Sequence, residues 1–190
     1  DPGGYALYKM AEFGPDGGLR GPARDVAAAT PDTEALLWHH LLSVDLVWGI
    51  DVSWVPMDCE LRWWVDDARQ IRTTTVRDYL WVRLLDIPRA LATRRYSAPG
   101  DVVLEVADRT GRGGTFRLEV DDHGRATCEQ VEAKADLACS VGSLGSIYLG
   151  GVGIDTLARA GRVEASSVEV LGRVAAMFAW HRAPHCDTTF

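Results

Sequence analysis

The sequence of 190 residues predicts an α+β protein in which a short mixed segment precedes a sheet with helices packed on it. Three observations predict this class. A strand-like run and a well-capped helix lie in the first part of the chain. Consecutive strand-like runs occupy residues 102–141, and apolar residues at helical spacing dominate the segment after them. Hydrophobic residues make up 47% and charged residues 25%, a composition typical of a globular chain long enough to bury a core.

The first part of the chain is predicted to hold one helix among strands. Thr30 is suited to cap a helix N-terminus, Pro31 suits the first helical position, and apolar residues at helical spacing continue to about Val44. Glycine and proline between residues 14 and 21 predict a turn or hairpin. Strands are predicted at residues 5–10 and within residues 51–65, on both sides of a break at 56–58.

The second part is predicted to begin with a new strand at residues 80–85 and a short helix at residues 89–94. A turn ends at Gly124, which can take a positive φ. Ser166 is predicted to cap the last helix, because Glu169 follows at the spacing of a capping box. The other predicted strands span residues 102–106, 115–120, 126–132 and 135–141, and the other helices 144–149, 154–160 and 167–180.

Acidic residues are concentrated in the first part of the chain, together with most of the tryptophans. The net charge is −7, and residues 1–78 hold 13 acids against 7 bases. A negative chain is a poor match to nucleic acid, so we predict no nucleic-acid partner. Five of the seven tryptophans lie in or beside the acidic stretch, a combination that suits a cationic ligand. The alternative is an ordinary core with a solvated acidic rim.

No membrane span and no metal site are predicted. No apolar run approaches the about 20 residues that a membrane-spanning helix needs. None of the four cysteines has the C-x-x-C spacing of zinc and redox sites, so we expect reduced thiols and a cytoplasmic location. His181, His185 and Cys186 lie close together in the sequence, but Pro184 interrupts the helix that could align them on a metal.

Several segments, taken in order and with their spacing, resemble one protein family. They are Gly4-Tyr5-Ala6-Leu7-Tyr8, Leu80-Trp81-Val82-Arg83-Leu84, Val103-Leu104-Glu105-Val106, Gly145-Ser146-Ile147-Tyr148-Leu149-Gly150 and the terminal Phe190. The combination resembles the Eis (enhanced intracellular survival) acetyltransferases of actinobacteria. Such proteins have an acetyl-CoA-binding GNAT domain, a second GNAT-like domain and a domain similar to sterol carrier proteins.

The resemblance implies that the chain is the C-terminal half of such a protein. Residues 1–77 would be the end of the central, partial GNAT-like domain, and residues 78–190 the sterol-carrier-like domain. The chain also begins at Asp1 rather than at a methionine, which predicts a piece of a longer protein. The family's phosphate-binding motif (Arg or Gln, two residues, Gly, one residue, Gly or Ala) does not occur in it. Acetyl-CoA is therefore expected to bind to the absent N-terminal GNAT domain.

The resemblance also implies what the full-length protein does. It would transfer acetyl groups from acetyl-CoA to amines of a polycationic acceptor, either an aminoglycoside or lysine side chains. The chain alone is expected to be inactive, and the full-length protein is expected to form a homo-hexamer.

Three site residues are implied in the same way. The terminal carboxylate of Phe190 would act as general base, while Asp58 and Asp187 would contact the acceptor amine. An α-carboxyl group has an unperturbed pKa of about 3.3–3.7, so it is ionised at neutral pH. Burial beside apolar groups would raise its pKa and its basicity. For Asp58 the alternative is a structural role in capping a turn.

The alternative function is a lipid-binding module, because sterol-carrier-like domains can hold a lipid between sheet and helices. Five apolar side chains would then line a tunnel rather than fill a core. They are Leu144, Ile147, Leu157, Leu171 and Phe178.

Overall fold

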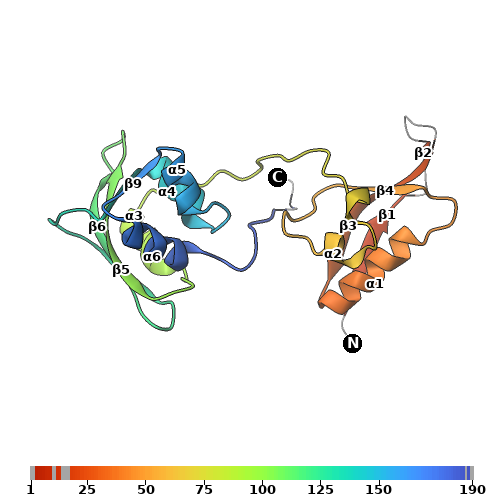
Figure 1. Ribbon diagram of the computed structural model, residues 1–190, viewed down its shortest axis with the longest axis horizontal. Helices are drawn as coiled ribbons and strands as arrows, with labels where there is room; N and C mark the ends of the chain where they lie inside the picture. The colour runs from red at the N-terminus through yellow and green to blue at the C-terminus, as the bar shows by residue number, and fades with distance from the viewer. Residues whose placement is uncertain (1–2, 10–11, 14–17, 187, 189–190) are drawn as a thin grey trace. The chain divides into compact units, whose positions relative to one another are not determined.

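A computed structural model describes residues 3–9, 12–13, 18–186 and 188 of the chain. These residues form two compact units (Figure 1). The first unit contains the described residues up to Arg77 together with those that follow Pro184, and the second unit spans Asp78–Pro184. Among the described residues, no helix is long and apolar enough to cross a membrane.

The first unit contains a four-stranded sheet built around one long strand. Strand β3 (Leu19–Ala28) pairs antiparallel with β1 (Gly4–Tyr8) and β2 (Glu12–Phe13), and parallel with β4 (Gly49–Val52). The sequence predicted β1 but not β3, because the glycine and proline residues between positions 14 and 21 favoured a turn or hairpin. Proline has no N–H to donate, and it is tolerated here because Pro22 lies between the β3 residues that pair with β1 and those that pair with β2. Its carbonyl oxygen accepts a hydrogen bond from the Lys9 N–H at 3.0 Å.

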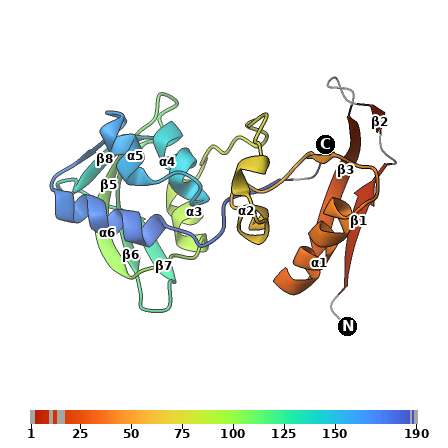
Figure 2. The same ribbon diagram turned by 45° about the vertical axis from the view of Figure 1, so that its right-hand side comes forward.

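One helix covers one face of this sheet. Helix α1 (Pro31–Leu42) begins as predicted, with the Thr30 hydroxyl accepting a hydrogen bond from the Thr33 N–H at 3.2 Å. It lies against β1 and β3 (Figure 2) and buries Trp38 and Leu41. The second strand predicted within residues 51–65 is wrong. The short helices α2 (Leu61–Trp64) and η1 (Ala68–Gln70) follow β4 instead.

The second unit contains a five-stranded sheet in the order β7-β6-β5-β8-β9. Only β5 and β8 pair in parallel, and the other neighbours are antiparallel. The predicted turn between β6 and β7 is confirmed, with Gly124 at a φ of 69°. The three-residue strand β9 was not predicted. The strands are β5 (Gly100–Ala107), β6 (Gly114–Val120), β7 (Ala126–Gln130), β8 (Leu137–Ser140) and β9 (Val163–Ala165).

The helices of the second unit lie on one side of its sheet in both views (Figure 1, Figure 2). They are α3 (Ile87–Thr93), α4 (Val141–Tyr148), α5 (Ile154–Arg159) and α6 (Val168–Phe178). A single apolar core lies between helices and sheet, with Leu91, Leu104 and Val174 at its centre. Strands followed by helices on one sheet face give the mixed α+β class that the sequence predicted.

Two details of the second unit differ from the sequence prediction. The strand predicted at residues 80–85 is wrong, because these residues pair with neither of the two sheets. The cap of α6 is Ser167, not Ser166, since the Ser167 hydroxyl accepts the hydrogen bond from the Val170 N–H at 3.3 Å. The predicted capping box was therefore placed one residue too early.

Candidate functional site

The acidic and aromatic stretch between β4 and α2 lies on the surface of the first unit. Asp58 is exposed and sits in a turn that the Cys59 N–H closes on the Pro56 carbonyl oxygen at 3.2 Å. Trp54 precedes this turn with a φ of 62°, a conformation that is rare for a bulky residue. Trp63, on α2, is 84% exposed. The stretch therefore presents carboxylates and indole rings to solvent, a combination that suits a cationic ligand.

Three side chains from two parts of this unit meet in what we name the carboxylate–thiol cluster. Glu34 comes from α1, and Cys59 and Glu60 come from the turn before α2. One ligand atom of each lies within 4.8 Å of the others. The Trp38 indole N–H donates to Glu34 Oε1 at 3.3 Å, which fixes that carboxylate. Sequence reasoning missed the cluster because Glu34 and Cys59 are brought together only by the fold.

The electrostatics of the carboxylate–thiol cluster favour a positive partner. Burial raises the pKa of the Cys59 thiol above its ordinary value, and the carboxylates of Glu34, Glu60 and Asp58 raise it further. The Leu61 N–H, which donates to the sulfur, opposes part of this shift. The thiol is therefore uncharged at neutral pH, and the half-buried carboxylates carry the negative charge. An ammonium group would relieve their mutual repulsion.

Helix N-termini bind anions, so the N-terminus of α1 is a candidate binding site for the pyrophosphate of acetyl-CoA. The residues present do not fit. Pro31 has no N–H to offer, and the N–H of Thr33 is already bound by Thr30. Asp32 and Glu34 add negative charge to the first turn, which would repel a phosphate. No step involving acetyl-CoA can be placed at this helix.

The end of the chain is described only in part. The predicted site residues Asp187 and Phe190 lie outside the described residues. The described residues that follow Pro184 group with the first unit, although the intervening chain belongs to the second. Cys186 donates from its sulfur to the Thr188 carbonyl oxygen at 3.7 Å.

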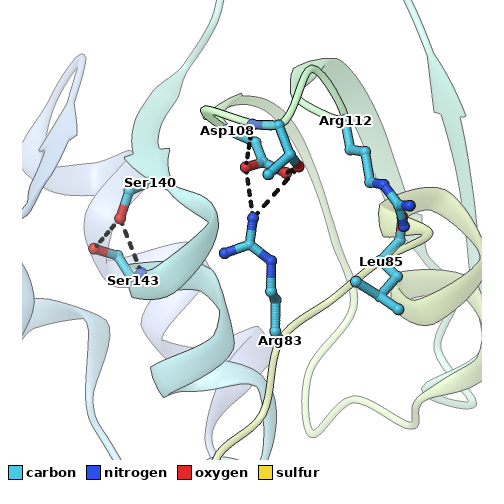
Figure 3. A network of polar contacts seen from close by, with 7 residues as sticks. Arg83, Leu85, Asp108, Arg112, Ser140 and Ser143 are labelled. Carbon is cyan, nitrogen blue, oxygen red and sulfur yellow. Dashed lines mark hydrogen bonds and ion pairs between the residues drawn. The ribbon is translucent and has the colours of Figure 1, made fainter.

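A polar network in the second unit holds residues 80–85 in place (Figure 3). Arg83 Nη2 lies 2.7 Å from Asp108 Oδ1, and the Asp108 side chain is 1% exposed. The Thr110 N–H and hydroxyl also donate to this carboxylate, at 3.0 and 2.8 Å. These hydrogen bonds, led by the Thr110 N–H and joined by the charge of Arg83, lower the pKa of Asp108. Arg112 donates to the Leu85 carbonyl oxygen at 3.4 Å, so the network anchors a segment that lacks strand pairing.

The five side chains proposed to line a lipid tunnel are placed mainly in the core. Leu144, Ile147 and Phe178 are buried in the apolar cluster, and Leu157 and Leu171 pack against it. In the described part of the chain, Phe178 alone among them also lines a hollow, of about 230 Å³, beside Trp180. The arrangement is that of a packed core.

Comparison with known proteins divides the chain at nearly the same place as the two units. Residues 1–84 match an acetyltransferase (GNAT) domain, and residues 87–187 match a sterol carrier protein domain. The GNAT match begins at residue 1, so this part is recognisable as an acetyltransferase domain and not only as the end of one.

The similar proteins are acetyltransferases. The chain is 40% identical over 185 residues to an uncharacterized N-acetyltransferase of Streptomyces coelicolor, covering 95% of the chain and 44% of the relative. It is 36% identical over 181 residues to N-acetyltransferase Eis of Mycobacterium tuberculosis, covering 94% and 43%. The crystal structure of Eis1 from Mycobacterium abscessus aligns with a TM-score of 0.85 at 31% identity, covering 98% of the chain and 48% of that protein. The chain thus spans less than half the length of these relatives.

Proposed function

Because the chain belongs to the Eis-like GNAT N-acetyltransferases, with a GNAT domain followed by a sterol carrier protein domain, we propose that it is the C-terminal half of such an enzyme. The likeness to Eis1 along 98% of the chain is the observation that carries this proposal. In the full-length protein the acetyl donor is acetyl-CoA. Since the start of α1 does not fit its pyrophosphate, we assign the cofactor to the N-terminal GNAT domain that the longer relatives have room for.

The proposed acceptor is an amine on a polycationic molecule, such as an aminoglycoside or a lysine side chain. Glu34 and Glu60 of the carboxylate–thiol cluster and the neighbouring Asp58 supply negative charge, and exposed indole rings lie beside them in the sequence. Carboxylates and aromatic faces attract ammonium groups by charge and by cation–π interaction. Asp187 is proposed as a further contact of the acceptor.

The proposed general base is the terminal carboxylate of Phe190. An ammonium group must lose a proton before its nitrogen can attack an acetyl carbon, and a positioned carboxylate can accept that proton. The described residues after Pro184 group with the first unit, which carries the acidic stretch. This grouping supports the proposed role of the chain's end. On the family resemblance we also propose a cytoplasmic homo-hexamer.

The experiment alters the end of the full-length protein. Adding a few residues after Phe190, or amidating it, should lower kcat for acetyl transfer by about 10²–10⁴-fold, the usual contribution of a general base. Phe190→Leu is the matched control, because it keeps the carboxylate and should lose far less. The thermal midpoint should barely move in either variant, since terminal residues contribute little to the core. Unchanged turnover in the extended protein would remove Phe190 from the site.

A further inference from the structure

The second sheet has one face that no described helix covers. Side chains alternate along its strands, and those that face the helices form the apolar core. The opposite positions carry five exposed acids and a single base, Arg117. We name this surface the acidic face. Its acids are Asp101, Glu105, Glu119, Glu129 and Glu164.

The charge of the acidic face does not follow from the composition of the unit. Residues 78–184 contain 14 acids and 13 bases, so the unit as a whole is nearly neutral. Five of those acids share the strands of this face with one base, and a second base, Arg162, lines the hollow described below. Arg117 is 3.9 Å from Asp101 and 3.7 Å from Glu119, so its charge is already divided between two carboxylates. The face is therefore strongly negative.

A hollow on the acidic face lies between two of its glutamates. Glu105 and Glu164 each stand opposite Ala138, on the strands to either side of it. Neighbouring strands are about 4.8 Å apart, so the two glutamates flank a gap of roughly 10 Å over a methyl group. The resulting hollow measures about 250 Å³ and is lined by both glutamates, by the methyl groups of Ala107 and Ala138, and by the base Arg162. Among the described residues, neither glutamate has an ion pair.

We propose that the acidic face docks a basic polypeptide segment, with one lysine or arginine side chain seated in the hollow between Glu105 and Glu164. Charge complementarity selects this partner, because two copies of so negative a face would repel each other. The methyl groups of Ala107 and Ala138 suit the methylene stem of such a side chain, while the flanking carboxylates bind its charged end. Acids spread over several strands suit an extended chain with repeated positive charges better than a single small cation.

The test measures the binding of a fluorescein-labelled oligolysine peptide to the intact chain by fluorescence anisotropy. We expect saturable binding that weakens as salt is raised, because exposed charges are screened. The double variant Glu105→Gln with Glu164→Gln should weaken binding about tenfold. Arg117→Gln should tighten binding severalfold, since one of the two positive charges at the face is removed.

The matched control is Asp122→Asn with Glu132→Gln, two exposed acids of the same unit that lie off the acidic face. It changes the net charge equally and should change the affinity less than about twofold. Thermal melts check that each variant is folded. Absence of saturable binding, or equal weakening in both double variants, would overturn the proposal. Self-association of the chain that Glu105→Gln with Glu164→Gln abolishes would also overturn it, by showing that a second copy occupies the face.

Discussion

The two units of this chain differ in how they are held together. In the second unit, 20 buried hydrophobic residues form one cluster. In the described part of the first unit, the core cluster has three buried members, Ala23, Trp38 and Leu41. Among the described residues, the first unit exposes 14 large hydrophobic side chains and the second exposes seven. The second unit is therefore stabilised by its own core, while the first has apolar surface suited to contacts with other groups. The unit with the smaller core also carries the carboxylate–thiol cluster.

The largest expected effect comes from deleting one core leucine in each unit. Leu104→Ala should lower the free energy of unfolding of the second unit by about 2–5 kcal/mol and leave it folded. Leu41→Ala, at an equally buried position in a core of three, should abolish the cooperative transition of the first unit. Tryptophan fluorescence during denaturant unfolding measures the first unit, which contains five of the seven tryptophans.

The control for this comparison is Leu36→Ala on the same helix as Leu41. Leu36 is 68% exposed, so its truncation should change the free energy of unfolding by less than about 0.5 kcal/mol. Similar losses for Leu36→Ala and Leu41→Ala would show that the first unit is held together by contacts other than this core.

A smaller effect is expected at the start of α6. Ser167→Ala removes the hydroxyl that caps the helix and should cost about 0.5–2 kcal/mol of stability in the second unit. Ser166→Ala should be close to neutral, because Ser166 is held through its backbone N–H, which donates to the Asp136 carbonyl oxygen at 2.8 Å. Urea melts of the two variants decide which serine caps the helix, and the reverse ranking would restore the sequence prediction.

The smallest expected effect is a pH dependence at Asp108. Its folded-state pKa is lowered, so its stabilising contribution is present above the unfolded value of about 3.9 and is lost as the pH falls through the folded value. The difference in free energy of unfolding between the wild type and Asp108→Asn should therefore become smaller as the pH is lowered below about 4. Thermal midpoints across this pH range measure the difference. A difference that does not change with pH would mean that the interaction with Arg83 and Thr110 does not depend on the charge of Asp108.

Local sequence signals predicted the second unit better than the first. Alternation located β5 and β6 in the second unit, because burial there follows the residue pattern. In the first unit, capping located α1. Strand β3 was missed because the glycine and proline residues between positions 14 and 21 favoured a turn or hairpin, and the strand forms only through its partners on both sides. Residues 61–65 alternate like a strand, yet four of them form a helix without a neighbouring strand to pair with. The meeting of Glu34 with Cys59 and Glu60 had no local signal at all.

We propose that this chain supplies the acceptor site of an acetyltransferase but not the acetyl-CoA site. The sharpest test measures the release of free thiol from acetyl-CoA in the presence of an aminoglycoside. The purified 190-residue chain is compared with the full-length protein proposed above. We predict no release above background from the chain alone and steady turnover from the longer protein. Steady turnover by the chain alone would contradict this division of roles, because the acetyl-CoA site would then lie within these two units.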